Sequence, residues 1–360
     1  MKKAFSALAV LLALCVALAG CHISTPDSVG AIGGIDIPSG LYLLAQFDAY
    51  QQAAQLAESE QDPADVKAFL KETVTLDEES GETALVSDYV ADKTLETLRL
   101  YAAVETRFEE LGGELTPDQL AQADSYAQQL LDNYGEVYTE NGIGLASLQL
   151  YQRNLAKSAA LLNLVYGPEG ETPVSEDQLL DHLDEMIYAV YLSVPLYDPE
   201  TFAFADEEQT DEMLALAEEA VAALPENVTA ASFQSSMTFA AAEMYSVLGS
   251  SYTPTSADFA SGFLLESDLE SSFTEEAADT VRSLSVGEGA AVQFTSYSIL
   301  LLVRLDPLET QTLDQVRNEV LADLCSDEFQ NALMEQGEAL PDTLDPAAMA
   351  KLPASRIQAG

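Results

Sequence analysis

Basic residues are scarce in this chain of 360 residues. Lysine and arginine together number 14 against 61 aspartates and glutamates, which gives a formal net charge of −47. Nucleic-acid binding needs Lys and Arg to displace counterions from phosphates, so the charge argues strongly against a nucleic-acid partner. It also disfavours a chain that lies flat on an anionic membrane surface. We interpret the negative charge as a means of keeping the protein soluble outside the cell. The alternative is that the charge attracts basic clients or cations.

Cysteine and histidine are also rare, at three and two residues. Cys325 is the only cysteine beyond the first 21 residues, and one thiol cannot form an internal disulfide. The sequence has no Cys/His cluster of the kind that binds zinc, so we expect neither a metal nor a cofactor. Cys325 falls on an apolar helix stripe and is predicted to be a core residue, and His182 is predicted to be an ordinary helix-face residue.

The apolar run at the N-terminus, residues 7–18, is too short to span a bilayer as a stable anchor. It follows two lysines, and this order of a positive and an apolar segment is typical of a secretory signal, predicted here over residues 1–20. The signal is followed by a polar tether, residues 21–30. The first twenty residues are therefore not expected to belong to the fold.

The sequence Leu-Ala-Gly-Cys21 at the end of this signal resembles the lipobox of bacterial lipoproteins. Its small residues fit a narrow peptidase cleft, and Cys21 supplies the thiol that accepts a diacylglyceryl group. The resemblance implies a lipid anchor on Cys21, which holds the protein at the extracytoplasmic face of the cell membrane without a transmembrane helix.

Residues 31–186 carry a helical pattern. Thr116 to Gln119 form a capping box with Pro117 at the first helical position, so a helix begins there. Another helix is predicted over Leu145–Tyr166, because its apolar residues share one face and Gly167-Pro168 ends it. None of these faces carries a convergent polar cluster, so their Leu and Tyr stripes are interpreted as core.

The pattern changes to a strand at Met186–Val194. A solvated acidic loop is predicted next, over Asp206–Glu212. Calcium binding is the alternative, but the loop lacks the ligand spacing of an EF-hand loop. Helices follow at Met213–Leu224 and around Phe233–Val247. A glycine turn at Gly262 then leads to one further helix, through about Ser272 to Leu284.

Two strands, near Ala291–Phe294 and Tyr297–Leu305, come after a tight Gly-Glu-Gly turn. The second ends in an apolar run, as a strand covered on both faces would. Beyond it, an amphipathic helix is predicted over Leu313–Leu333, and the tail, 338–360, is predicted to be disordered.

The order of parts in residues 187–306, with Leu-x-x-x-Phe before a helix and Leu-x-Val-Gly-Glu after it, resembles a parvulin-type peptidyl-prolyl isomerase domain. In that family the first and last strands each carry a histidine, and here the matching positions hold Tyr191 and Ser298. The resemblance therefore implies the scaffold of an isomerase without its histidine pair. The replaced pair argues against isomerase activity, which stays an alternative because twisting and desolvating an X–Pro amide needs no nucleophile in principle.

Carried over residue by residue, Leu269 and Phe273 match the apolar pair that lines the family's proline pocket. Phe263, just after the turn at Gly262, is predicted to bind substrate with them. The equally weighted alternative for Leu269 and Phe273 is that they are core residues at a helix start.

Most of the chain beyond the signal resembles the PrsA/SurA-type extracytoplasmic foldases, in which a short strand and a Gly turn open a helical domain. The expected class is α+β. A mostly helical domain, 31–186, contains an inserted parvulin-like domain, 187–306, with a roughly four-stranded antiparallel sheet. A returning helix, 308–337, completes the helical domain. The implied function is a membrane-anchored folding factor that binds unfolded exported polypeptides. An active isomerase of the same build and a lipoprotein adaptor for a single partner are the alternatives.

Overall fold

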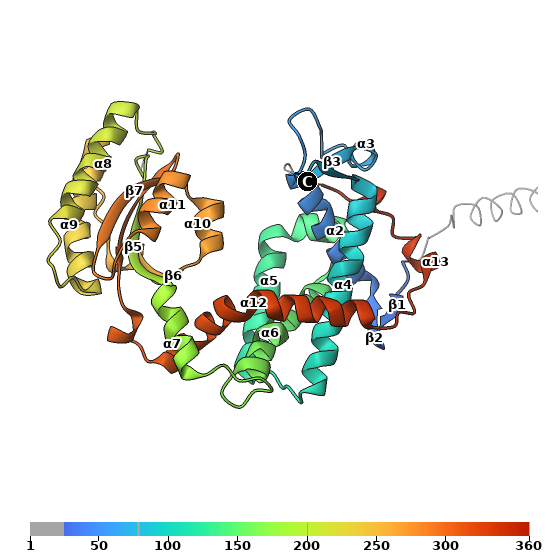
Figure 1. The fold of residues 1–360 in the computed structure, drawn as a ribbon. Helices are drawn as coiled ribbons and strands as arrows, with labels where there is room; N and C mark the ends of the chain where they lie inside the picture. Colours follow the sequence, from blue (N-terminus) through green and yellow to red (C-terminus); the bar gives the residue numbers. More distant parts are fainter. Residues whose placement is uncertain (1–24, 78–79, 200, 360) are drawn as a thin grey trace, which may run out of the picture. The chain divides into compact units, whose positions relative to one another are not determined.

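The computed structural model describes residues 25–77, 80–199 and 201–359 (Figure 1). The signal, the lipobox and Cys21 lie outside this part of the chain. The chain divides into two compact units. We call them the helical unit (25–165, 169–171 and 327–359) and the sheet unit (166–168 and 172–326). Within the described residues, no helix is both long enough and apolar enough to cross a membrane. The predicted class is confirmed, since a four-stranded antiparallel sheet is inserted into a mostly helical chain.

The helical unit opens with a tight β-hairpin. Gly33 and Gly34 form its two-residue loop with φ values of 59° and 84°, and Ile32 pairs with Ile35. A loop with positive φ at both positions matches the twist of antiparallel strands, and glycine adopts it without steric cost. The elements before α7 are β1 (Ser28–Ile32), β2 (Ile35–Pro38), α2 (Ser39–Gln55), α3 (Val66–Phe69), β3 (Thr73–Asp77), β4 (Glu82–Leu85), α4 (Val86–Glu110), α5 (Pro117–Glu140) and α6 (Leu145–Tyr166).

The returning helix is confirmed. Helix α12 runs from Leu313 to Ala339, and its last part belongs to the helical unit. Gly337 there lies so close to α4 that an added Cβ would be 2.8 Å from the carbonyl oxygen of Arg99. Because glycine has no Cβ, the backbones of α12 and α4 can pack closely at this point.

The prediction of a disordered tail is wrong. Residues after α12 form α13 (Pro346–Met349) and a 3₁₀ turn, η3 (Ala354–Arg356). The amides of Thr343 and Asp345 donate to the carbonyls of Ala31 and Val29, each at 2.8 Å, so the tail lies along β1. Three apolar side chains of the tail are buried in the helical unit's core, Ala348, Leu352 and Ile357. They are too few and too irregularly spaced to give a periodic signal in the sequence.

The sheet unit contains four strands in the order β6-β5-β8-β7, all antiparallel. Helices α8 and α9 cover one face of the sheet, and α10 and α11 cover the other (Figure 1). Its further elements, besides the first part of α12, are α7 (Glu176–Glu185), β5 (Ile187–Pro195), α8 (Glu207–Ala222), α9 (Ala230–Val247), η1 (Ser256–Asp258), β6 (Phe259–Leu264), α10 (Glu266–Ser272), α11 (Glu275–Arg282), β7 (Gly289–Thr295), β8 (Ser298–Arg304) and η2 (Pro307–Glu309).

The lower boundary of the inserted unit differs from the predicted residue 187, because α7 belongs to the sheet unit. The Arg304 guanidinium on β8 donates to the carbonyls of Asp184 and Met186 at 3.1 and 3.0 Å. His182 contacts Asp323 of α12 at 2.8 Å. These contacts hold α7 to the sheet and to the start of α12, and sequence periodicity does not reveal them.

Two local predictions are corrected. The acidic stretch 206–212 is mainly the start of α8, where Asp206 accepts from the amide of Gln209 as N-cap and acids occupy the first turn. Carboxylates at that end are favoured by the helix dipole. The helix predicted over about 272–284 is α11, and a further helix that was not predicted, α10, precedes it; the two are separated at Phe273, whose backbone is extended (φ −109°, ψ 155°). The burial of Cys325 is confirmed.

Candidate functional site

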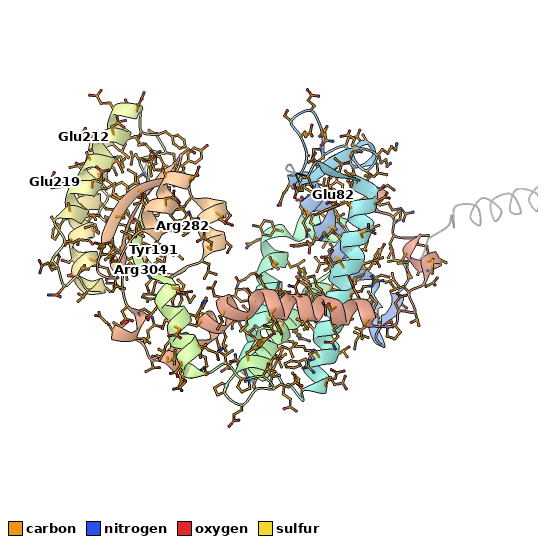
Figure 2. All side chains as sticks on the ribbon, in the orientation of Figure 1. Glu82, Tyr191, Glu212, Glu219, Arg282 and Arg304 are labelled. Carbon is orange, nitrogen blue, oxygen red and sulfur yellow. The ribbon has the colours of Figure 1, made fainter. Side chains whose placement is uncertain are left out.

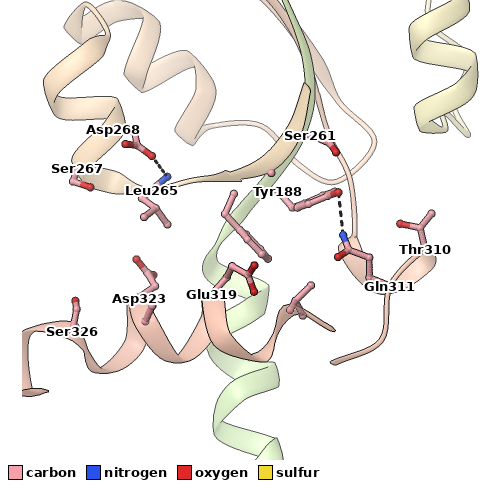
Figure 3. Close-up of a pocket in the computed structure, with 14 residues that line it drawn as sticks. Tyr188, Ser261, Leu265, Ser267, Asp268, Thr310, Gln311, Glu319, Asp323 and Ser326 are labelled. Carbon is pink, nitrogen blue, oxygen red and sulfur yellow. Dashed lines mark hydrogen bonds between the residues drawn. The ribbon is translucent and has the colours of Figure 1, made fainter. Parts of the chain in front are cut away.

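A groove with a volume of about 880 Å³ runs between strand β6 and the first part of α12, entirely within the sheet unit (Figure 3). Its strand side carries Phe263 and Tyr188, whose rings meet edge to face with centroids 5.3 Å apart. Its helix side carries Val316, Glu319 and Asp323. The groove has the size range of small-molecule and peptide sites and combines an apolar wall with a few polar groups.

The Tyr188 side chain is fixed at one end of this groove. Its hydroxyl accepts a hydrogen bond from the side-chain amide of Gln311 at 3.0 Å. Gln311 lies two residues before α12, whose start is fixed because the amide of Thr312 donates to the side chain of Gln315 at 2.8 Å. The strand wall and the helix wall are therefore tied together at this end.

Strand β6 is an edge strand, and its outer backbone groups face the groove. The amide of Leu305 donates to the carbonyl of Tyr188, and the amide of Leu196 donates to the carbonyl of Tyr297. Even-numbered residues of β5 thus direct their backbone groups towards β8, and odd-numbered ones towards β6. Tyr188 is paired with Phe263, so the N–H and C=O groups of Phe263 and, two residues earlier, Ser261 point away from β5.

The charged side chains that line the groove are acids alone. Asp268 accepts from the amide of Leu265 at 3.2 Å, and Asp323 contacts His182. Glu319 makes no hydrogen bond or ion pair to any residue that the structure describes, and Figure 3 shows it on α12, on the helix side of the groove. A group that compensates the Glu319 charge would have to come from a ligand or from solvent cations.

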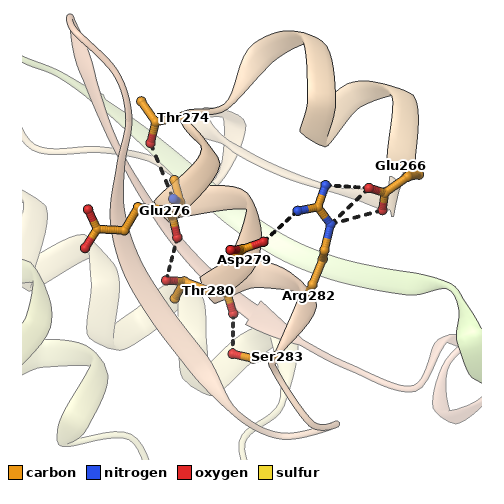
Figure 4. Close-up of polar contacts among 8 residues, drawn as sticks. Glu266, Thr274, Glu276, Asp279, Thr280, Arg282 and Ser283 are labelled. Atoms are coloured by element: carbon orange, nitrogen blue, oxygen red, sulfur yellow. Dashed lines mark hydrogen bonds and ion pairs between the residues drawn. The ribbon is translucent and has the colours of Figure 1, made fainter.

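The sheet unit as a whole is strongly acidic. Residues 172–326 contain 29 aspartates and glutamates against three arginines and no lysine. Arg282 pairs with Glu266 and Asp279 (Figure 4), Arg304 binds backbone carbonyls, and Arg317 pairs with Asp314 at 2.8 Å. All three arginines are thus engaged within the unit, and Glu212 and Glu219 on α8 add to its charge (Figure 2).

The structure does not bring Tyr191 and Ser298 together. Tyr191 on β5 is paired with Leu302, whereas Ser298 on β8 is paired with Pro195. The two positions are four residues apart along the strands, or about 13 Å. They share a sheet face, since Tyr191 packs against the cluster under α10 and α11, but their side chains cannot act as one hydrogen-bonded pair.

The predicted substrate-binding residues are divided between the two faces of the sheet. Leu269 is 1% exposed and belongs to the core under α10 and α11, so it does not line an open site. Phe273 is half-buried and packs on Phe294 with ring centroids 5.2 Å apart. Phe263 alone among the three lines the groove.

Sequence reasoning missed the helix side of the groove and Tyr188. Val316, Glu319 and Asp323 were covered only by the prediction of a returning amphipathic helix. Nothing in their spacing indicates that they face β6, which lies more than 50 residues earlier in the chain. The pattern Phe259, Ser261, Phe263 is the one available signal, since its alternation places these residues on one face of a strand.

The chain is similar to known proteins at the level of solved structures. No protein-family model matches the chain, and no curated protein matches it. The chain is similar to the crystal structure of foldase protein PrsA from Streptococcus pneumoniae str. Canada MDR_19A, with 12% identity and a TM-score of 0.36. The similarity covers 74% of this chain and 93% of that chain.

Proposed function

We propose that this chain is a lipid-anchored, extracytoplasmic folding factor that binds unfolded exported polypeptides in the groove between β6 and α12. The observation that carries the proposal is an open strand edge beside an apolar wall, within a cavity of about 880 Å³. An unfolded chain offers apolar side chains and unpaired backbone groups together, and this groove accommodates both. A folded partner with its backbone already paired has less to gain there.

The anchor rests on the sequence. Changing Cys21 to Ala removes the thiol that the lipobox resemblance assigns to lipidation. We expect the Cys21→Ala protein to remain unprocessed or to be released into the medium, as followed by cell fractionation and by mass analysis of the N-terminus. Normal processing with unchanged membrane retention would contradict the anchor and leave the groove proposal standing.

Client binding is tested by the aggregation of chemically unfolded exported proteins, followed by light scattering. We expect the protein to suppress aggregation of several unrelated clients, and Phe263→Asp to weaken client binding at least tenfold, since burying a Phe side chain is worth about 1.5–3 kcal/mol. Phe239→Asp is the matched control, because Phe239 lies on α9, is 73% exposed and is not part of the groove. Circular dichroism checks that both variants fold.

Contrary outcomes of this test separate the alternatives. Suppression for a single client only would favour the adaptor. Acceleration of proline-limited refolding equal to that of an active parvulin would favour the isomerase. We expect little acceleration, because Tyr191 and Ser298 do not form a pair.

A further inference from the structure

We infer that the groove takes its client as an added β-strand on the edge of β6, and that it prefers segments in which every second residue is Lys or Arg. The inference rests on the proposed function and specifies how the same site recognises its clients. It has three parts: the open backbone of β6, the arrangement of acids opposite it, and the charge of the whole sheet unit.

The open backbone provides the attachment. Ser261 and Phe263 direct their N–H and C=O groups away from β5 and into the groove. An added strand would lie about 4.8 Å from β6 and would pair with these groups independently of its own sequence. Exposed edges normally carry charges, prolines or bulges that prevent such pairing. Strand β6 (Phe-Ala-Ser-Gly-Phe-Leu) has no charged residue and no proline, and it pairs with β5 without a bulge.

The side chains around the groove define which residues fit. Because successive side chains of a strand point to opposite faces, every second side chain of an added strand reaches the same wall. Glu319 and Asp323 stand on that helix wall (Figure 3), and the rings of Phe263 and Tyr188 stand on the strand wall. A Lys or Arg side chain satisfies both walls, because its aliphatic stem packs on a ring while its charged end reaches a carboxylate.

The charge of the sheet unit selects among possible occupants. With 29 acids and three arginines that are already engaged, residues 172–326 attract basic chains and repel acidic ones. The same charge opposes edge-to-edge pairing of β6 with a second copy of this protein. A segment of an unfolded polypeptide that alternates basic and other residues is the occupant that meets all three features.

The test uses the purified protein with two fluorescent peptides of the same composition and charge. One alternates lysine and valine, and the other carries three lysines followed by three valines. We expect the alternating peptide to bind about tenfold more tightly in fluorescence anisotropy. Two pairs of variants then address the backbone and the charge separately.

The backbone pair is Ser261→Pro and Ser261→Ala. Proline at 261 removes an N–H that points into the groove. It removes no hydrogen bond between β6 and β5, so the substitution is compatible with an edge strand. We expect Ser261→Pro to bind the alternating peptide about tenfold more weakly than Ser261→Ala, which loses the same hydroxyl but keeps the backbone N–H. The charge pair is Glu319→Lys and Glu212→Lys. We expect Glu319→Lys to weaken binding of the alternating peptide at least tenfold. Glu212→Lys is the control, because it makes the same change in net charge on α8, away from the groove.

Equal binding of the two peptides, or wild-type affinity in Ser261→Pro, would overturn strand addition. Equal effects of Glu319→Lys and Glu212→Lys would show that net charge attracts the peptide and that the groove does not select it, which overturns the preference for basic residues at alternate positions. Either result leaves the proposed function intact if the protein still suppresses aggregation and Phe263→Asp abolishes that effect. Loss of suppression in the wild-type protein is the separate outcome that contradicts the proposed function.

Discussion

Changing Leu352 and Ile357 together to alanine is expected to lower the free energy of unfolding of the helical unit by about 4 kcal/mol or more. Both side chains lie in the C-terminal tail and are buried, at 6% and 7% exposure. Each large-to-small change in a core costs about 2–5 kcal/mol, since apolar contact is lost and a cavity remains. The cost falls at the low end for each site here, because a terminal segment can relax.

The two residues anchor the tail at separate places. Leu352 packs in the cluster that contains β1 and β2, where its carbonyl accepts from the side-chain amide of Gln46 at 3.3 Å. Ile357 packs in the second cluster, and the neighbouring Gln358 exchanges two hydrogen bonds of 2.9 Å with the Asn141 side chain. The double variant therefore releases the tail from both clusters.

The measurement is urea unfolding followed by circular dichroism, with hydrogen exchange of α2 and the β1–β2 hairpin to locate the loss. Lys351→Ala is the control, since Lys351 directly precedes Leu352 and is exposed. A disordered tail, as the sequence alone predicted, would give no difference between the double variant and the control. Faster exchange in α2 of the double variant only is the expected pattern.

The sequence predicted elements well where one local signal decided the structure. Helix α6 has the predicted bounds, Leu145–Tyr166, because a strong apolar face ends at Gly167-Pro168. The capping box at Thr116 likewise marks the start of α5. The four-stranded sheet was predicted from alternation and from the resemblance to parvulins, and both signals are confined to residues 187–306.

Prediction failed where contacts join distant residues. The tail docks through a few apolar residues with no common period, and their partners lie some 300 residues earlier. The groove arises because α12 approaches β6, and no local pattern encodes that approach. Tyr191 and Ser298 were matched to the two family histidine positions, but their offset of four residues depends on the register of β5 and β8, which only the pairing itself defines.

Replacing Asp48 with asparagine is expected to stabilise the protein at neutral pH by about 3 kcal/mol. Asp48 lies on α2 among the apolar residues of the helical unit, and burial raises the pKa of its carboxyl from 3.8 to about 6. It makes no hydrogen bond or ion pair to any residue that the structure describes. The negative charge of Asp48 in turn contributes to raising the pKa of Tyr138 and Tyr151, after burial, so it is close to both rings.

The sign follows from the two protonation states. A raised folded-state pKa means that the folded protein holds the Asp48 proton more tightly than the unfolded chain does. The resulting contribution to stability is present in full below pH 3.8 and is lost as the pH rises through about 6. A shift of about two units corresponds to about 3 kcal/mol at neutral pH, at about 1.36 kcal/mol per unit. Asparagine has nearly the same shape and no charge, so it avoids this loss.

We expect the difference in unfolding free energy between Asp48→Asn and the wild-type protein to grow from about 1.5 kcal/mol at pH 5 to about 3 kcal/mol at pH 7.5. Urea unfolding at both pH values measures it. The control is Asp92→Asn on α4, which removes one charge from an exposed position of the same unit. Because the net charge of −47 makes total stability depend on pH, only the difference between variant and wild type isolates Asp48. A difference that is equal at the two pH values, or equal to that of Asp92→Asn, would show that Asp48 is ionised at no cost in the folded protein.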